Sequence, residues 1–312
     1  MYNRIANRAL WKEPGDKTET SSTTKFSKTS PSDDIASSSS KKRPSRSKKS
    51  VVAELPPAPK PEPNPSDEKK DDSLTMNITI GTRQRQTTGF AIASRGDYLK
   101  ILTCAHIVED VYSRDRHTVT IEELNTAFTF DVVCMHQENR ILEMDSTVPI
   151  SRRTRMMTQV RAAEIDTSKD LLVLELNIGY LRLSEHGYCH SDHPIIPVAQ
   201  IPPQVREKVI LLGWPPHRSQ SVSGGKVSFL NRTYDTVCHI DFNLKGYRMK
   251  LMEVSGLVYS HGYSGGPLLN NNSEFTGMYH GTIEMKGYSV SLEEIHSFLT
   301  RFEVMTKWPA DE

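Results

Sequence analysis

The sequence contains no long apolar run. No stretch approaches the roughly 18–20 consecutive apolar residues that a membrane-spanning helix requires. The N-terminal MYNRIANRALWKEPGDK has no continuous apolar core of the kind found in secretory signals, and its early acids Glu13, Asp16 and Glu19 are unusual in organellar transit peptides. We therefore predict that the protein does not associate with a membrane and that it works in the nucleus or the cytoplasm.

Cysteine is also scarce. Four cysteines occur among 312 residues, and no pair has the CxxC spacing of a zinc module. A disulfide framework would need an oxidising compartment, to which nothing in the sequence directs the chain. We predict reduced thiols at the four positions Cys104, Cys134, Cys189 and Cys238.

One segment, EHGYCHSDH at residues 185–193, gathers side chains of the types that bind zinc. The four side chains belong to His186, Cys189, His190 and His193. Their spacing matches no standard zinc site, which favours a polar loop. We therefore predict no metal and no cofactor.

Large apolar residues are few in the first 75 residues, where serine, threonine, lysine and proline predominate. Such a stretch cannot bury enough apolar surface to offset its ordering entropy, so we predict that residues 1–75 are disordered, with an extended spacer at Pro56–Pro65. Its basic cluster, KKRPSRSKK at Lys41–Lys49, fits either a signal for a nuclear import receptor or a solvated charge run. The whole chain has 39 basic and 38 acidic residues, which argues against a protein built wholly around nucleic acid.

The composition changes at about Met76, where short β-rich runs alternate with turn residues. Many short strands separated by glycine, asparagine and proline indicate an all-β sandwich or barrel. One helix is expected near the end, because Ser291 and Glu294 have the spacing of a capping box and apolar residues recur on one face from Ile295 to Phe302. We predict a domain at residues 76–305 and a short tail at residues 306–312. The expected strands are MNITI, TTGFAIAS, YLKILTCAHIV, FTFDVVCM, VRAAEI, DLLVLEL, KVILLGW, KVSFL, TVCHIDF, RMKLMEV, GGPLL and FTGMYHGTI.

Three patterns in this β region carry reactive side chains. His106 follows a strand in LTCAHIVED, Asp170 opens a strand in SKDLLVLEL, and Ser264 lies in the glycine-rich turn HGYSGGPLLN. A serine hydroxyl needs a nearby base to become a nucleophile, a histidine has a suitable pKa, and a buried aspartate can orient the imidazole. The backbone N–H groups of Gly262 and Ser264 can serve as donors to an oxyanion.

The order His, Asp, Ser is that of chymotrypsin-fold enzymes, and the region from about Gly81 to Phe302 resembles a trypsin-like serine protease domain of the HtrA/Deg type. The resemblance implies two six-stranded antiparallel β-barrels and a serine endopeptidase that acts on proteins or peptides through an acyl-enzyme. It also implies His106 as general base, Asp170 as its orienter and Ser264 as nucleophile, with Gly262 in the oxyanion hole. The similar segments are TTGFAIASRGDYLKILTCAHIVED, VRAAEIDTSKDLLVLEL, VILLGWPPHRSQSVSGGKVSFLNR and GYSGGPLLNNNSEFTGMYHGTI.

Some positions depart from the family's pattern. Tyr263 stands where digestive enzymes have an aspartate, which argues against activation by zymogen cleavage, and Ile107 replaces a disulfide cysteine. HtrA enzymes often carry a PDZ domain after the protease domain, and we expect none here, because only about ten residues follow the expected last helix. Val258 corresponds to the base of the primary specificity pocket and suggests small or medium apolar side chains in substrates. Because HtrA relatives are often trimers, the resemblance also suggests a homo-oligomer.

Several alternatives stay open at this point. Asp145 and Asp166 compete with Asp170 for the third role, and Asp170 is favoured because it directly opens the apolar strand. The long stretch Met135–Gln159, which carries a basic cluster at Arg152, Arg153 and Arg155, is expected to be a surface loop. Two other functions compete with proteolysis: a protease-like scaffold that binds peptides without cutting them, and a nucleic-acid-associated protein that uses the basic tail at Lys41–Lys49.

Overall fold

The computed structural model describes residues 74–80, 83–116, 118–134, 158–178, 193–215, 221–239 and 242–308. Residues Lys69–Glu312 form one compact unit. The expected disordered tail, with its basic cluster and its proline-rich spacer, lies outside the described residues except for the two residues that begin the first strand. Asp145 and nearly all of Met135–Gln159 also lie outside them.

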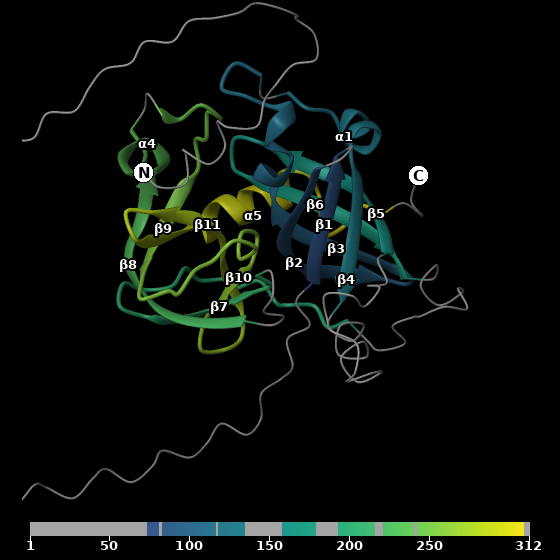
Figure 1. Ribbon diagram of the computed structural model, residues 1–312. Coiled ribbons are helices and arrows are strands. Elements are labelled where there is room, and N and C mark those ends of the chain that lie inside the picture. Colours follow the sequence, from purple (N-terminus) through teal and green to yellow (C-terminus); the bar gives the residue numbers. More distant parts are fainter. Residues whose placement is uncertain are drawn as a thin grey trace, which may run out of the picture. The chain divides into compact units, whose positions relative to one another are not determined.

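Six strands close into a first antiparallel barrel, on the right in Figure 1. The order around the barrel is β1–β2–β3–β6–β5–β4, and pairing of β4 with β1 completes the circle. A 3-10 helix, η1 (Ala105–Val111), follows β3, and α1 (Ile121–Ala127) precedes β4. The strands are β1 (Leu74–Ile80), β2 (Arg83–Arg95), β3 (Tyr98–Cys104), β4 (Thr129–Cys134), β5 (Thr158–Asp166) and β6 (Leu171–Asn177).

The second barrel, on the left in Figure 1, has the order β10–β11–β12–β9–β8–β7 and closes by pairing of β7 with β10. A short helix, α4 (Tyr234–Val237), follows β8, and α5 (Leu292–Arg301) follows β12. The strands are β7 (Lys208–Gly213), β8 (Ser221–Thr233), β9 (Lys250–Ser255), β10 (Pro267–Leu269), β11 (Phe275–Ile283) and β12 (Lys286–Ser291).

Each barrel contains one long strand that bends as it passes from one neighbouring strand to the next. Residues 83–89 of β2 pair with β1 and residues 90–95 with β3, while β8 passes from β7 to β9 at Lys226. Bulges in both strands increase the local bend, as barrel closure requires. At the bend in β8, a Cβ on Gly225 would lie 2.7 Å from the Val254 side chain, so β9 packs directly against bare backbone.

The two barrels are joined by backbone hydrogen bonds that run through residues 196–199. The Ile196 N–H donates to the Ala91 carbonyl of β2 (3.0 Å), and the Ala199 N–H donates to the Phe275 carbonyl of β11 (2.9 Å). Beside these bonds the Phe90 and Phe275 rings pack with their centroids 4.5 Å apart. The junction therefore fixes β2 of one barrel against β11 of the other, and both strands reach the candidate site.

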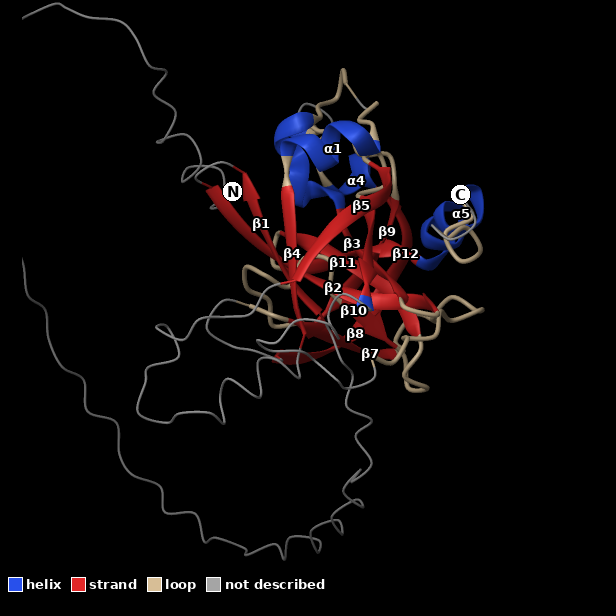
Figure 2. Ribbon diagram, turned by 90° about the vertical axis from the view of Figure 1, so that its right-hand side faces the viewer, coloured by secondary structure: helices blue, strands red, loops and turns tan. Residues whose placement is uncertain are grey.

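Figure 2 shows α1 and α4 at one end of the strands, with α5 set apart from them. Helix α5 packs through the predicted face, which includes the buried Ile295 and Phe298. The predicted capping box, however, is wrong. Ser291 is the N-cap residue, but its hydroxyl makes no cap bond because Ser291 also ends β12 with its side chain buried. Glu294 instead accepts the Lys250 N–H (3.2 Å).

The predicted all-β fold with two six-stranded barrels and a C-terminal helix is confirmed. Two strand predictions are corrected. The described residues of the run TVCHIDF form no strand, because its start belongs to α4. The loop after it is held by Asn243, which donates to the Asp235 carboxylate (3.2 Å) and the Tyr247 carbonyl (2.8 Å). Strand β12, KGYSVS, was not predicted, because its glycine and serines interrupt the apolar pattern of a strand that is nevertheless buried.

None of the helices in the described ranges is long and apolar enough to cross a membrane. Cys104 and Cys238 are free thiols, as predicted. Cys189 lies outside the described residues, and the surroundings of Cys134 are not described.

Candidate active site

Asp170 is presented by a tight turn between β5 and β6. The carboxylate of Asp166, the competing aspartate, closes this turn by accepting the N–H groups of Ser168 (3.1 Å) and Lys169 (3.2 Å) and the Ser168 hydroxyl (2.7 Å). Asp170 follows with a φ of +59°, in the left-handed region, and it is completely buried. The local turn thus separates the two aspartates: Asp166 serves the backbone, and Asp170 points into the protein.

His106 and Asp170 are joined at two points. The backbone N–H of His106 donates to Oδ1 of Asp170 (2.6 Å), and Nδ1 of the His106 ring lies 2.8 Å from Oδ2. A backbone bond from the Ala105 N–H to the Asp170 carbonyl (3.1 Å) supports the pair. The structure therefore brings together the first two residues that the sequence predicted, although they stand 64 positions apart.

This contact changes the pKa values of both residues. Burial by itself would lower the pKa of His106, but the Asp170 charge and its hydrogen bond outweigh it, so the pKa of His106 lies well above its ordinary value. Burial would raise the pKa of Asp170, but His106 and a second histidine, His280, outweigh it, so the pKa of that carboxyl lies well below its usual range. Asp170 is therefore a carboxylate at neutral pH.

His280, on β11, is a member of the cluster that the sequence analysis missed. Its Nδ1 lies 2.5 Å from Oδ2 of Asp170, the oxygen that also faces His106. The two imidazole rings meet edge to face, with centroids 5.4 Å apart and an interplanar angle of 89°. The available signal was a histidine inside the apolar run FTGMYHGTI, which was interpreted only as a strand.

Ser264 lies in a turn of the second barrel that is tied to β2 of the first. Its carbonyl accepts the Thr88 N–H (2.9 Å) and the Thr87 hydroxyl. Its own hydroxyl donates to the His280 carbonyl, at a long 3.4 Å. Within the described part of the chain, no hydrogen bond joins Ser264 Oγ to His106. The third predicted residue therefore contacts the cluster through His280.

The glycines around Ser264 have the backbone shapes that the turn requires. Gly262 has a φ of +92° and Gly265 a φ of +78°, conformations that residues with a Cβ rarely adopt. A Cβ on Gly265 would lie 2.2 Å from the Thr88 carbonyl oxygen. Among the described residues, the N–H groups of Gly262 and Ser264 have no hydrogen-bond acceptor, so both are free to bind an oxygen from a ligand.

Cys104 is a second neighbour of the site that the sequence did not reveal. Its sulfur lies 3.5 Å from Nε2 of His106 and 3.2 Å from the Thr87 hydroxyl, and it is completely buried. The sequence indicated only a reduced thiol at this position. The ring nitrogen that would serve as a base therefore faces a thiol in this arrangement.

The donor atoms of His106, Asp170 and His280 lie within 4.8 Å of one another, and these side chains are of types that bind zinc. Both histidine nitrogens, however, are at hydrogen-bonding distance from one carboxylate oxygen, at 2.8 Å and 2.5 Å. Ligand atoms of a tetrahedral zinc site stand about 3.3–3.5 Å apart, which follows from Zn–N bonds of about 2.0–2.1 Å. The cluster is thus built as a set of hydrogen bonds. Of the histidine-rich segment 185–193, only His193 is described.

Val258, the residue expected at the base of a specificity pocket, is 69% exposed. Its N–H donates to the Ser223 hydroxyl (2.6 Å). The neighbouring Leu257 is the buried one, and it packs so closely that a Cβ on Gly225 or Gly287 would lie 2.9 Å from its methyl groups. The role given to Val258 stays a prediction.

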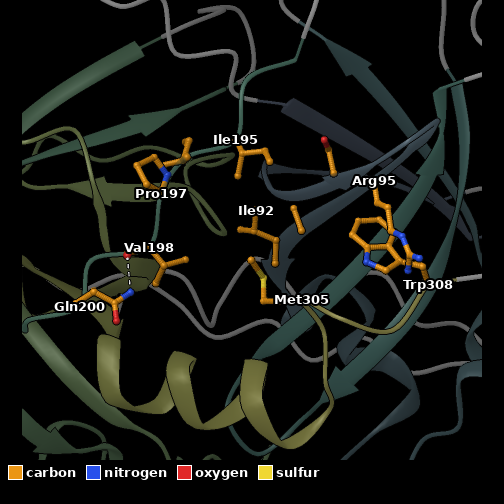
Figure 3. Close-up of a pocket in the computed structure, with 11 residues that line it drawn as sticks. Ile92, Arg95, Ile195, Pro197, Val198, Gln200, Met305 and Trp308 are labelled. Atoms are coloured by element: carbon orange, nitrogen blue, oxygen red, sulfur yellow. Dashed lines mark hydrogen bonds between the residues drawn. The ribbon is translucent and has the colours of Figure 1, made fainter.

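A separate cavity of about 500 Å³ lies beside β2, near the end of the described chain, and is shown in Figure 3. Ile92, Ile195 and Met305 present apolar side chains around it, while Arg95 lies beside Trp308. None of the predicted catalytic residues lines this cavity. It is therefore distinct from the site around Asp170.

Two closed antiparallel barrels, with a histidine–aspartate pair from one and a glycine-flanked serine from the other, define the fold class of chymotrypsin-like proteases. The family model described as the trypsin-like peptidase domain matches residues 87–278, which is more than half of the chain. The chain therefore belongs to this family, and the predicted assignment as a serine-type endopeptidase, a hydrolase, is confirmed. A comparison with curated protein sequences gave no match.

Solved structures with a similar fold include other serine proteases. The active form of the Rv3671c protease from M. tuberculosis shares 14% identity with a TM-score of 0.50, over 81% of this chain and 94% of that one. The serine endoprotease from Yersinia pestis shares 16% identity with a TM-score of 0.46, over 74% and 62%. Deg5 shares 15% identity with a TM-score of 0.48, over 73% and 87%. The first of these likenesses supports the fold.

Proposed function

We propose that the protein hydrolyses peptide bonds through a triad of Ser264, His106 and Asp170, with an acyl-enzyme intermediate. The observation that carries the proposal is the two-point contact between Asp170 and His106, with hydrogen bonds of 2.6 Å and 2.8 Å. This contact fixes the imidazole tautomer so that Nδ1 carries the proton and Nε2 is left as the acceptor. A base held in this way is what a serine hydroxyl needs to become a nucleophile.

The proposed reaction has two balanced steps. Nε2 of His106 takes the proton of the Ser264 hydroxyl as Oγ bonds to the substrate carbonyl carbon, and the imidazolium then donates that proton to the departing amine. Water repeats the sequence on the acyl-enzyme and releases the acid and the free serine. The Asp170 carboxylate stabilises the imidazolium in both steps, which agrees with the raised pKa of His106.

The serine hydroxyl must move for this chemistry. Its present bond to the His280 carbonyl is 3.4 Å long, near the limit of a hydrogen bond, so rotation of the Ser264 side chain costs little. Catalytic hydrogen bonds are often long or poorly aligned without substrate and tighten in the complex. We propose that substrate binding accompanies this rotation and that Ser264 then donates to Nε2 of His106 in place of Cys104.

The tetrahedral intermediate needs donors for its oxyanion. The N–H groups of Gly262 and Ser264 suit this role, because they are two residues apart in one turn and have no acceptor among the described residues. Removal of one such donor typically costs about 10²–10³ in rate. Gly262 has a φ of +92°, a backbone conformation that a residue with a Cβ rarely adopts, and this glycine is proposed as a part of the oxyanion hole.

The proposal is tested with the purified chain and casein as an unstructured substrate. Turnover is expected in the wild type, and Ser264→Ala should lose about 10⁴-fold or more while the fold is retained. A fluorophosphonate probe should label the native wild type at Ser264 and leave Ser264→Ala unlabelled. Ser260→Ala, in the same loop, is the matched control and should keep wild-type activity and labelling.

Equal turnover by the wild type and Ser264→Ala would overturn the proposal. Peptide binding without turnover in the wild type would instead favour a protease-like scaffold. The triad acts as a unit, so a double variant with His106→Ala and Ser264→Ala should be little worse than either single variant.

A further inference from the structure

We propose that His280 is a positioning residue, which holds the Asp170 carboxylate in place and limits how strongly that carboxylate stabilises the imidazolium of His106. The inference deepens the proposed function and rests on it. It starts from a contact that joins the second barrel to the acid–base pair of the first. His280 Nδ1 lies 2.5 Å from Asp170 Oδ2, across 110 positions of sequence.

The direction of this hydrogen bond follows from the charges. Asp170 is a carboxylate, which can only accept, so Nδ1 of His280 must carry the proton and donate it. Oδ2 of Asp170 then receives two imidazole donors, and Oδ1 receives the His106 N–H at 2.6 Å. All three bonds are short, and together they prevent rotation of the carboxylate. A completely buried carboxylate needs several such partners to offset the loss of water.

The other groups around His280 are aromatic and uncharged at neutral pH. Tyr247 and Tyr234 pack against its ring at centroid distances of 5.2 Å and 5.6 Å. The Tyr247 hydroxyl bonds to that of Tyr112 (3.0 Å), and burial, followed by the Asp170 charge, raises the pKa of both tyrosines well above the ordinary value. Further from the site, the backbone carbonyl of Glu109 accepts a hydrogen bond from Nζ of Lys245 (2.5 Å), and that ammonium lies 5.7 Å from the centre of the Tyr112 ring.

Within the described residues, Asp170 and His106 are therefore the charged groups in direct contact with this histidine. A second donor on Oδ2 competes with His106 for the charge of the carboxylate. That competition weakens the stabilisation of the His106 imidazolium by Asp170, and the imidazolium must give up its Nε2 proton in each catalytic cycle. The backbone carbonyl of His280 also accepts a hydrogen bond from the Ser264 hydroxyl, so His280 contacts both Asp170 and Ser264 of the proposed triad.

The test compares variants that keep or remove the donor. His280→Asn places an amide N–H near the position of Nδ1, whereas His280→Phe keeps the ring among the tyrosines and removes the donor. His296→Phe is the matched control, because His296 is a partly buried histidine whose Nε2 contacts the Ala199 carbonyl (2.8 Å), away from the site. His280→Leu is a second variant without a donor, for use if the phenylalanine disturbs folding as judged by circular dichroism.

The first readout does not depend on turnover. Imidazole nitrogen NMR in the Ser264→Ala background follows the titration of His106 in each variant. We expect the pKa of His106 to be higher in His280→Phe than in the parent, and to be close to the parent in His280→Asn and His296→Phe. An unchanged pKa in His280→Phe, or an equal rise in His280→Asn, would overturn the proposal.

The second readout is turnover with Ser264 intact. His280→Phe should lower kcat by about 10- to 100-fold, the range supported by one hydrogen bond to a charged group, while KM stays within about threefold. His280→Asn should recover most of kcat. Equal losses in the two variants would indicate a packing role and contradict the proposal. A chain with no wild-type turnover but a shifted His106 pKa in His280→Phe would refute the proposed function and leave the role of His280 intact.

Discussion

The two barrels position their parts of the site by different physical means. The first barrel holds His106 and Asp170 together through two hydrogen bonds to the buried Asp170 carboxylate, of 2.6 Å and 2.8 Å. The second barrel holds Ser264 through backbone geometry, with left-handed glycines on either side of it and its carbonyl bonded to Thr88. The acid–base pair should therefore be sensitive to changes of hydrogen-bonding chemistry, and the nucleophile turn to the addition of any Cβ.

The largest expected effect comes from changing the chemistry in the first barrel alone. Asp170→Asn keeps the shape but replaces one acceptor oxygen with an amide that donates, although three N–H groups point at this carboxylate. We expect kcat to fall about 10⁴-fold, because the imidazole is then held in the wrong tautomer. Steady-state kinetics on a peptide substrate measures the loss. Asp166→Asn is the control; a similar loss there would mean that the turn matters and the orienting role of Asp170 is wrong.

A Cβ in the second barrel should have the next largest effect. In Gly265→Ala the new methyl would lie 2.2 Å from the Thr88 carbonyl oxygen and 2.5 Å from the Thr103 hydroxyl, at a φ of +78°. We expect a loss of about 2–4 kcal/mol in the free energy of unfolding, from overpacking and backbone strain together. Urea denaturation measures it. Gly281→Ala meets nothing within 4 Å and should change stability by less than about 0.5 kcal/mol. Similar values for the two variants would contradict the steric argument.

The first barrel also fixes the end of the described chain by side-chain bonds. Lys100 on β3 is buried, and its ammonium donates to the carbonyls of Val304 (2.7 Å) and Lys307 and lies 4.7 Å from the Trp308 ring centre. Burial lowers the pKa of Lys100. Lys100→Met leaves two acceptors without this donor.

We expect Lys100→Met to lose about 1–3 kcal/mol in the free energy of unfolding, measured by urea denaturation. Lys250→Met breaks a half-exposed pair with Glu293 and should cost less than about 1 kcal/mol. If the exposed pair proved the costlier one, the first barrel would not hold the chain end in this way.

The smallest expected effect concerns pH. His106 acts as a base only when it is neutral, and the Asp170 charge, which outweighs burial, raises the pKa of His106 above 6.5. The value of kcat/KM should therefore increase with pH through a midpoint above 6.5 and decrease as the pH falls below it. In Asp170→Asn the midpoint should move down, because the attracting charge is gone. A wild-type midpoint below 6.5 would show that burial, and not Asp170, controls this histidine.

The sequence predicted much of the fold because the signals involved are local. Alternating apolar residues and turn glycines indicated most of the strands, and the apolar spacing of Ile295, Phe298 and Leu299 indicated the face that α5 buries. Prediction from the sequence failed where a local pattern is compatible with two structures. The polar KGYSVS run forms strand β12, and the spacing of Ser291 and Glu294 forms no capping box. A true capping box joins Thr120 and Glu123 at α1, and the same rule applied there would have found that helix.

The amino-acid sequence itself determined the order of His106, Asp170 and Ser264 and the glycines that allow the serine turn. The local motif around each of these residues depends only on the residue and its nearest neighbours in the chain. Tertiary structure alone decided that Asp170 has two histidine partners, that Cys104 faces His106, and that the serine hydroxyl contacts the His280 carbonyl. Apart from the contact between Cys104 and His106, these contacts depend on how the two closed barrels pack against each other. Closure and docking bring together residues that no local pattern connects, such as Thr87 and Ser264, which stand 177 positions apart.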